Sequence, residues 1–243
     1  YTSGFSTDLL WQIIRSGGTY NATVLDRVRG DDLFLYTNGS GSEVTSTVWR
    51  FDSNEGIWLD GTYSAASNLG GLMFKRAPGF FDIVNFDGTG VARTEDHGLG
   101  VTPEFYIVKA RNSTRDWSCY HSALGATKSI RIDRNLGPLT GAAYWNDTDP
   151  TATQFSLGTS VHTNGSGYKY IAYLFASLDG ISKLGSYTGT GSDINVDCGF
   201  TAGARFVLIK RTDSSGNWYL WDTARGITAG NDPYLFLDTT DAE

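Results

Sequence analysis

Two pairs of neighbouring side chains could recognise a sugar: Tyr120 with His121, and Trp221 with Asp222. Proteins hold carbohydrates through a flat ring that stacks on the C–H face of the sugar and a polar group that hydrogen-bonds to its hydroxyls. Because successive residues of a strand point to opposite faces, the two members of one pair cannot both face the same side. We therefore predict these four residues as ligand-binding candidates.

Patterns for catalysis or metal binding do not emerge from the sequence. The three histidines, His97, His121 and His162, have no partner at the spacing of a metal site or a catalytic triad. No nucleophile elbow, phosphate loop or dinucleotide-binding glycine pattern is present. Two acidic segments, 52–56 and 147–149, resemble calcium loops but do not continue into a full ligand set. We expect a non-enzymatic protein with no catalytic residue, no metal and no cofactor.

The sequence matches itself at an offset of 101 residues. Residues 79–125 lie over residues 180–226 with 12 identities in 47 positions and no gap. An earlier copy is also visible, since residues 8–15 lie over 104–111 at an offset of 96. Such a period indicates a repeated structural unit. We predict three units: residues 1–79, truncated at the N-terminal side; residues 80–179, complete; and residues 180–243, which stop before any counterpart of 154–176.

This alignment ranks the aromatic candidates. Trp117 and Trp218 occupy the same position in two units, which favours a core role for both. Tyr120 is replaced by Trp221, and His121 by Asp222, so these positions are better candidates for the surface. We expect a binding face to keep the same core residues in each unit and to vary the side chains that it exposes.

Each unit is predicted to be a succession of short strands. In the second unit we expect them at 81–86, 105–109, 117–121, 128–132, 142–145, 155–157 and 168–175, with a hairpin turn at Asp87–Gly90. Leu9–Arg15 could form a helix in isolation, but its alignment with a strand of the second unit predicts a strand. Short connections favour an antiparallel arrangement. The predicted fold is all-β, built of tandem antiparallel β-sandwich, jelly-roll-like modules with a repeat of about 95–101 residues.

Composition excludes several partners. The formal net charge of −7 argues against an electrostatic grip on nucleic acid or an anionic membrane. No stretch approaches the roughly 18 apolar residues of a membrane span, so we expect no membrane insertion. The two cysteines, Cys119 and Cys198, are at non-equivalent positions of their units. A bridge belonging to the unit would recur in each copy, so two unpaired thiols are favoured.

Several phrases resemble a repeated domain of unknown function found in tail-fibre, tailspike and other virion-associated structural proteins of tailed bacteriophages. They are the segments 97–109, 117–128, 155–158 and 164–173, together with 4–11 and 26–30 in the first unit. The resemblance covers nearly the whole chain. It implies a location in the virion, contacts with other virion proteins and, by analogy with such appendages, a homotrimer.

From the residues and the resemblance we expect a phage virion structural protein, part of a tail fibre, spike or similar appendage, that attaches to the host surface or binds its glycans. Two alternatives stay open. One is a purely structural spacer or capsid-decorating module. The other is a polysaccharide depolymerase, because the plentiful carboxylates could include a facing pair of the kind that glycosidases use.

Overall fold

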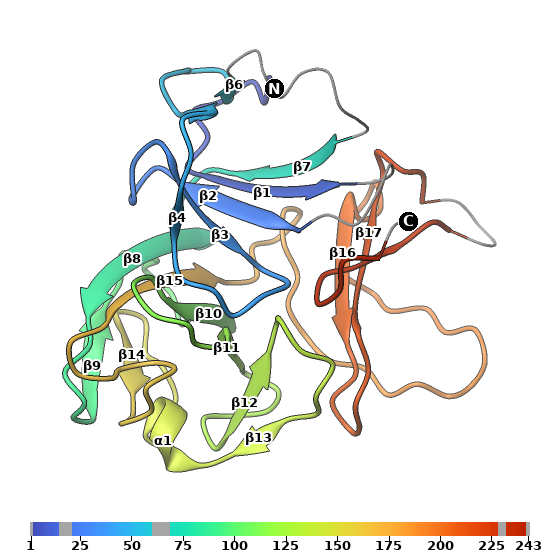
Figure 1. Cartoon of the computed structure of the whole chain (residues 1–243). Helices are drawn as coiled ribbons and strands as arrows, with labels where there is room; N and C mark the ends of the chain where they lie inside the picture. Colours follow the sequence, from blue (N-terminus) through green and yellow to red (C-terminus); the bar gives the residue numbers. More distant parts are fainter. Residues whose placement is uncertain (1, 15–20, 60–68, 228–231, 242–243) are drawn as a thin grey trace.

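The computed structural model describes residues 2–14, 21–59, 69–227 and 232–241. In this part of the chain the protein is all-β, with eighteen strands and one four-residue helix. The strands form several open antiparallel sheets, and none closes into a barrel. The three largest sheets face one another around the middle of the molecule (Figure 1).

The first sheet comes from the N-terminal third of the chain. Its strand order is β4 (Val44–Thr45), β3 (Leu33–Tyr36), β2 (Thr23–Asp26), β1 (Leu9–Ile14) and β7 (Leu69–Phe74). A small separate pair is formed by β5 (Trp49–Arg50) and β6 (Trp58–Leu59). The strand predicted at Leu9–Arg15 is confirmed as far as Ile14, and Arg15 lies outside the described residues.

The second sheet has six strands. Their order is β13 (Leu139–Thr140), β12 (Lys128–Arg131), β11 (Ser118–His121), β10 (Phe105–Ala110), β15 (Lys169–Phe175) and β8 (Phe81–Asp87). A two-stranded sheet of β9 (Arg93–Asp96) and β14 (Gln154–Leu157) accompanies it. The third sheet has the order β16 (Phe206–Lys210), β17 (Trp218–Asp222) and β18 (Leu235–Phe236).

The first two sheets share a pattern of pairing. β1 lies between β2 and β7, and β10 lies between β11 and β15. The register also corresponds, because Leu9 pairs with Phe74 and Phe105 pairs with Phe175. In the third sheet β16 pairs with β17 as β10 pairs with β11.

One large apolar core joins the three sheets. It contains Trp11 of the first sheet, Trp117 and Ile107 of the second, and Trp218 and Leu220 of the third. The other face of the second sheet packs on β9, β14 and the helix in a separate core around Tyr106 and Phe155. The other face of the first sheet forms a third core with β5 and its neighbours. The second sheet is therefore covered on one face by its own stretch of chain and on the other by the two neighbouring sheets.

The prediction of a strand at Ala142–Trp145 is wrong, because these residues form the helix α1 (Ala142–Trp145). Asn146 ends it in a left-handed conformation, φ 54°, and its N–H donates to the carbonyl of Ala142 at 2.7 Å. Trp145 is fully buried and its indole Nε1 donates to the carbonyl of Lys128. A side chain at Gly158 would lie 2.3 Å from the carbonyl oxygen of Ala143, so only glycine allows β14 to approach α1.

The predicted hairpin at Asp87–Gly90 is also wrong. β8 pairs with β15 and β9 pairs with β14, so this segment crosses from one sheet to another. Asn164 holds the crossing. Its side-chain Oδ1 accepts from the N–H of Thr89 at 2.9 Å, and its Nδ2 donates to the carbonyls of Val91 and Gly158 at 2.7 and 2.8 Å. The amide is fully buried, so its bonds replace water for three backbone groups.

Replacing Asn164 with Ala should lower the free energy of unfolding by about 2–3 kcal/mol, because the backbone groups of Thr89, Val91 and Gly158 would lose the buried amide to which they bond. Urea unfolding followed by tryptophan fluorescence measures the change. The exposed Asn135 provides the control, and Asn135→Ala should change stability by no more than about 0.5 kcal/mol. Equal effects of the two substitutions would contradict the role assigned to Asn164.

Candidate functional site

β17 separates its side chains by strand alternation. Trp218 and Leu220 are buried in the central core, whereas Tyr219 and Trp221 point to the other side and are partly exposed. The core placement predicted for Trp218 is confirmed, and that of Trp117 as well. Trp221 therefore lies on the outer face of the third sheet.

Four rings gather on this outer face, which we call the aromatic face: Tyr219, Trp221, Tyr234 and Phe236. Tyr219 and Trp221 stack with centroids 5.6 Å apart and planes 12° apart. Tyr234 lies 5.3 Å from Tyr219 and 5.9 Å from Trp221, and 41% of its surface is exposed. Tyr219, Tyr234 and Phe236 were not among the residues predicted from the sequence, and the only signal for them was alternation on β17 and β18. The rings form an apolar surface that a planar or apolar partner could cover.

Asp222 has a local partner. Its Oδ1 accepts from the N–H of Arg225 at 3.0 Å, and its Oδ2 accepts from Nε of Arg225 at 2.9 Å. The Arg225 side chain also donates to the carbonyl of Leu220. The same arrangement joins Asp26 and Arg29 after β2. Both carboxylate oxygens of Asp222 are thus used in ordering the turn after β17.

The surface placement predicted for Tyr120 is wrong. Only 2% of its surface is exposed, and its ring stacks on Tyr106 with centroids 4.6 Å apart. Its hydroxyl donates to Oδ1 of Asp149 at 3.0 Å, and burial together with this bond raises the pKa of Tyr120. α1 and β14 pack over this face of β11, whereas neither packs over the aromatic face on β17. No face of the Tyr120 ring is open to a sugar.

His121 is half-buried at the position that Asp26 and Asp222 occupy in the other sheets. Its Nδ1 accepts from the N–H of Ala123 at 3.1 Å, so it also orders the turn after its strand. Burial lowers the pKa of the imidazole, and the nearby carboxylate of Glu104 opposes this shift. The lowered pKa favours the neutral imidazole, which acts as a hydrogen-bond acceptor at this turn.

Two of the three tryptophans in the central core, Trp117 and Trp218, bond to backbone of the preceding stretch of chain. The indole Nε1 of Trp117 donates to the carbonyls of Tyr36 and Gly39 at 2.9 and 3.1 Å. Beside it, Nζ of Lys109 donates to the carbonyl of Ser40 at 3.0 Å and lies 5.8 Å from the Trp117 ring centre. We call this pair, and the pair of Trp218 with Lys210, a clamp. The first clamp ties β10 and β11 to the end of β3.

A second clamp of the same kind occurs one unit later. Nε1 of Trp218 donates to the carbonyl of Arg131, and Nζ of Lys210 donates to the carbonyl of Arg134. The ammonium again lies 5.8 Å from the indole ring centre. Arg131 is 95 residues after Tyr36, the offset at which Gly125 follows Gly30. The two indole donors therefore reach equivalent acceptors, whereas the two lysine acceptors differ by one position, because Ser40 lies over Asn135 at this offset.

Lys109 is a fully buried cation. Burial lowers the pKa of its ammonium to about 8, with the carboxylates of Asp133 and Asp116 opposing the shift. Burial also raises the pKa of Asp133 to about 6, and its Oδ1 accepts from the backbone N–H of Trp117. Lys109 of the first clamp and the neighbouring Asp133 are thus a base and an acid whose charged forms are destabilised by burial.

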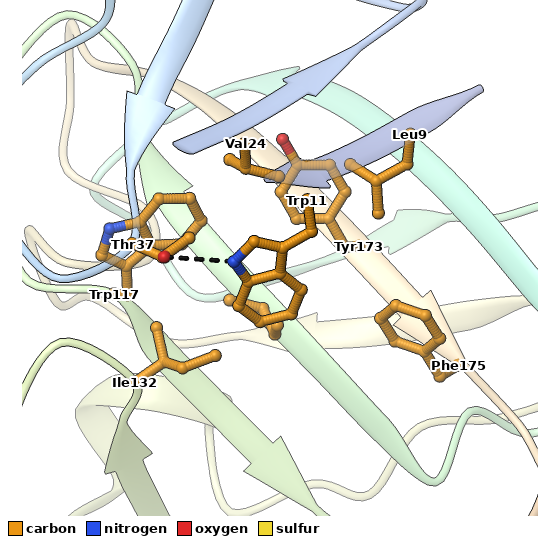
Figure 2. Close-up of a pocket in the computed structure, with 9 residues that line it drawn as sticks. Leu9, Trp11, Val24, Thr37, Trp117, Ile132, Tyr173 and Phe175 are labelled. Atoms are coloured by element: carbon orange, nitrogen blue, oxygen red, sulfur yellow. Dashed lines mark hydrogen bonds between the residues drawn. The ribbon is translucent and has the colours of Figure 1, made fainter. Parts of the chain in front are cut away.

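The central core contains a cavity of about 10 Å³ between the first and second sheets. Trp11 points into it from β1 and Tyr173 from β15, and Nε1 of Trp11 donates to Oγ1 of Thr37 at 3.1 Å beside it (Figure 2). This volume is at the lower limit for a single water molecule. The cavity is too small to bind a sugar or a cofactor.

Both cysteines are unpaired, as the sequence predicts. Cys119 is buried in the central core, where burial raises the pKa of its thiol, and Cys198 is partly exposed. Across the described residues, no three His, Cys, Asp or Glu side chains come together in a way that could hold a metal ion. The described chain also contains no helix with the length and apolarity needed to cross a membrane.

A comparison with protein families matches residues 75–243 to a domain of unknown function, DUF7483. The match covers all of the second sheet, the third sheet and the aromatic face. Comparisons with curated proteins and with solved structures find no match.

Raising the pH from 8 towards 10.5 should stabilise the protein through Lys109. The folded state releases the Lys109 proton near pH 8, whereas the unfolded chain keeps it up to about pH 10.5, so the unfolded state binds more protons in this window. Lys109→Met should reduce the slope of the unfolding free energy against pH there by up to about 1.4 kcal/mol per pH unit.

Urea unfolding at several pH values between 7.5 and 10.5 measures this slope. Lys128→Met removes a lysine whose Nζ bonds to Thr140 in an exposed position, and it should leave the slope unchanged. Parallel curves for the wild type and Lys109→Met would contradict the lowered pKa assigned to the buried Lys109.

Proposed function

Because the chain belongs to the DUF7483 family, a domain of unknown function, we propose its role from its own architecture. We propose a phage virion structural protein in which tandem β units, with boundaries at 1–79, 80–179 and 180–243, build part of a tail fibre, spike or similar appendage. The virion is its location, and other virion proteins are its partners. The proposal includes no catalysis and no cofactor.

The observation that carries this proposal is the twofold occurrence of the clamp. An indole N–H and a lysine ammonium of one stretch of chain bond to backbone carbonyls at the end of the strand equivalent to β3 in the preceding stretch. The contact joins two different surfaces, so it can be repeated from one unit to the next without closing on itself. Contacts of this kind suit an extended particle component better than a compact enzyme.

A backbone hydrogen bond recurs at equivalent positions in all three stretches and also supports tandem units. The N–H groups of Arg27, Ser122 and Thr223 donate to the carbonyls of Asp8, Glu104 and Arg205, with distances of 2.8, 2.8 and 3.0 Å. Each bond joins the turn after the second strand of its sheet to the start of the first strand. We propose that each complete unit is a jelly-roll-like sandwich, on the basis that β9, β14 and α1 cover one face of the second sheet.

Host-glycan binding is the second part of the proposal, and the aromatic face favours it. Of the two aromatic candidates Tyr120 and Trp221, only Trp221 presents a partly exposed ring, and Tyr219 and Tyr234 extend the apolar surface beside it. Affinity for one sugar chain would be weak at such an open surface, and repetition in an oligomer could raise the avidity by roughly 10² or more. A spacer or capsid-decorating module would use the same clamps and bind no glycan.

Immunogold labelling tests the structural role. Antibodies against residues 1–243 should label a tail fibre, spike or other appendage on particles released from cells that carry the gene. Label over the capsid would favour the decorating alternative. Particles that remain unlabelled, while the denatured protein is detected elsewhere in the lysate, would contradict a virion location.

The full-length protein should be a homotrimer, because the appendages that it resembles are usually threefold and small units gain stability by burying surface on one another. Light scattering coupled to size exclusion should give three times the mass of one chain at micromolar concentration, where one copy of residues 1–243 contributes 26.4 kDa. A mass equal to one chain would refute the trimer.

Trp221→Ala should reduce attachment to host cells and to isolated host glycan severalfold while changing the melting temperature little, because the ring is partly exposed. Trp58→Ala is the matched control, since Trp58 is 55% exposed and lies away from this face on β6. Unchanged glycan binding by folded Trp221→Ala would remove the aromatic face as the binding site. Release of new reducing ends from the glycan by the wild type would favour the depolymerase alternative.

A further inference from the structure

The first strand of the third sheet has one free edge. β16 pairs with β17 through Phe206–Asp222 and the residues that follow, but no described strand pairs with its other side. The corresponding strands β1 and β10 are paired on both sides, the second side being occupied by β7 and β15. All five residues of β16 are partly exposed, whereas all six of β10 are buried. An edge with free N–H and C=O groups is a site for strand addition.

β7 and β15 indicate what kind of strand fits such an edge. Both run antiparallel to their partner, and both place a phenylalanine opposite its first core residue: Phe74 opposite Leu9, and Phe175 opposite Phe105. The equivalent position on β16 is Phe206. The Phe206 ring lies 6.4 Å from the ring of Phe74 in an edge-to-face contact, at the border of the central core. A phenylalanine opposite Phe206 would extend this aromatic cluster.

Residues 182–188 provide an independent observation. They are the counterpart of β8 at the offset of 101, yet they form no strand. β8 reaches its sheet only through β15, so a counterpart of β8 has no edge to pair with until a strand lies on β16. The consequence is visible in exposure: Tyr187 is 50% exposed, whereas its counterpart Phe86 is 7% exposed. Ile181, the residue just before this segment, is 61% exposed.

We propose that the free edge of β16 and residues 182–188 form a slot for one antiparallel strand of the β15 type, supplied by a further copy of the unit. This inference rests on the tandem units of the proposed function and names the partner of the free edge of β16. The incoming strand pairs with β16 on one side and with 182–188 on the other. It has about seven residues, is apolar on both faces as Lys169–Phe175 mostly is, and carries phenylalanine opposite Phe206.

The test appends a second copy of residues 139–178 to the 243-residue protein, which supplies counterparts of β13, α1, β14 and β15. Hydrogen exchange measured by mass spectrometry should slow on the order of tenfold or more at 182–188 and at 206–210, because both segments gain a paired strand. The melting temperature should rise together with this slower exchange. The control is the same protein with Ala172→Pro in the appended copy only, which removes a ladder N–H in the middle of the strand and should abolish the protection.

A second arm uses a synthetic peptide with the sequence of residues 168–176, added to the unmodified protein. Protection of 182–188 and 206–210 by the peptide supports the slot without any change to the chain. Unchanged exchange at both segments in the two arms overturns the proposal. Protection confined to Tyr219 and Trp221 also overturns it, because the added segment would then cover the aromatic face and not the edge. These readouts do not depend on particles, so failure here is distinguishable from failure of the labelling experiment.

Discussion

The central core shared by three sheets is the constraint on which the rest of the structure depends. Each sheet has an apolar face that must be buried, and in this protein the three faces are buried against one another. Full burial of one large apolar side chain is worth about 1.5–3 kcal/mol, and this core contains the indoles of Trp11, Trp117 and Trp218 among many others. Exposed ion pairs such as Arg211 with Asp213 contribute far less. Apolar burial therefore determines how the sheets are placed relative to one another, and the exposed ion pairs have little influence on that placement.

The same burial creates polar groups that need partners inside the core. Asp26 and Arg29 are fully buried as an ion pair, and the hydroxyl of Tyr173 donates to Oδ2 of Asp26 at 2.8 Å. Glu43 extends the group to Arg111, at 2.9 Å between Oε2 and Nε. Burial raises the pKa of Tyr173, which keeps the phenol protonated as a donor. Such buried pairs add little net stability compared with apolar packing, but an error in sheet placement would leave them unpaired, so they favour one arrangement.

The clamps act in the same way at the boundaries between stretches. Trp117 and Trp218 must each place an N–H on an acceptor inside this core, and backbone carbonyls of the preceding sheet supply it. This couples the position of each sheet to the end of the one before it. The equivalent strand positions then acquire different surroundings: Tyr120 lies under α1 and β14, while Trp221 lies on an open face. A ligand or protein that binds Trp221 would contact a strand, β17, whose position is already fixed by the buried side chain of Trp218.

The sequence by itself determined that the chain is all-β, that Leu9–Ile14 is a strand, that Trp117 and Trp218 are core residues and that the cysteines are unpaired. These features follow from the alternation of apolar and polar residues and from the comparison of one stretch of chain with another. Both can be seen in the residue types alone. Only the tertiary structure decided that Tyr120 is buried, that Ala142–Trp145 is a helix and that one core joins three sheets. The physical reason is that alternation assigns a side chain to one of two faces but cannot say what covers that face. At Tyr120 the cover comes from residues 142–157, and at the central core from sheets about 100 residues apart.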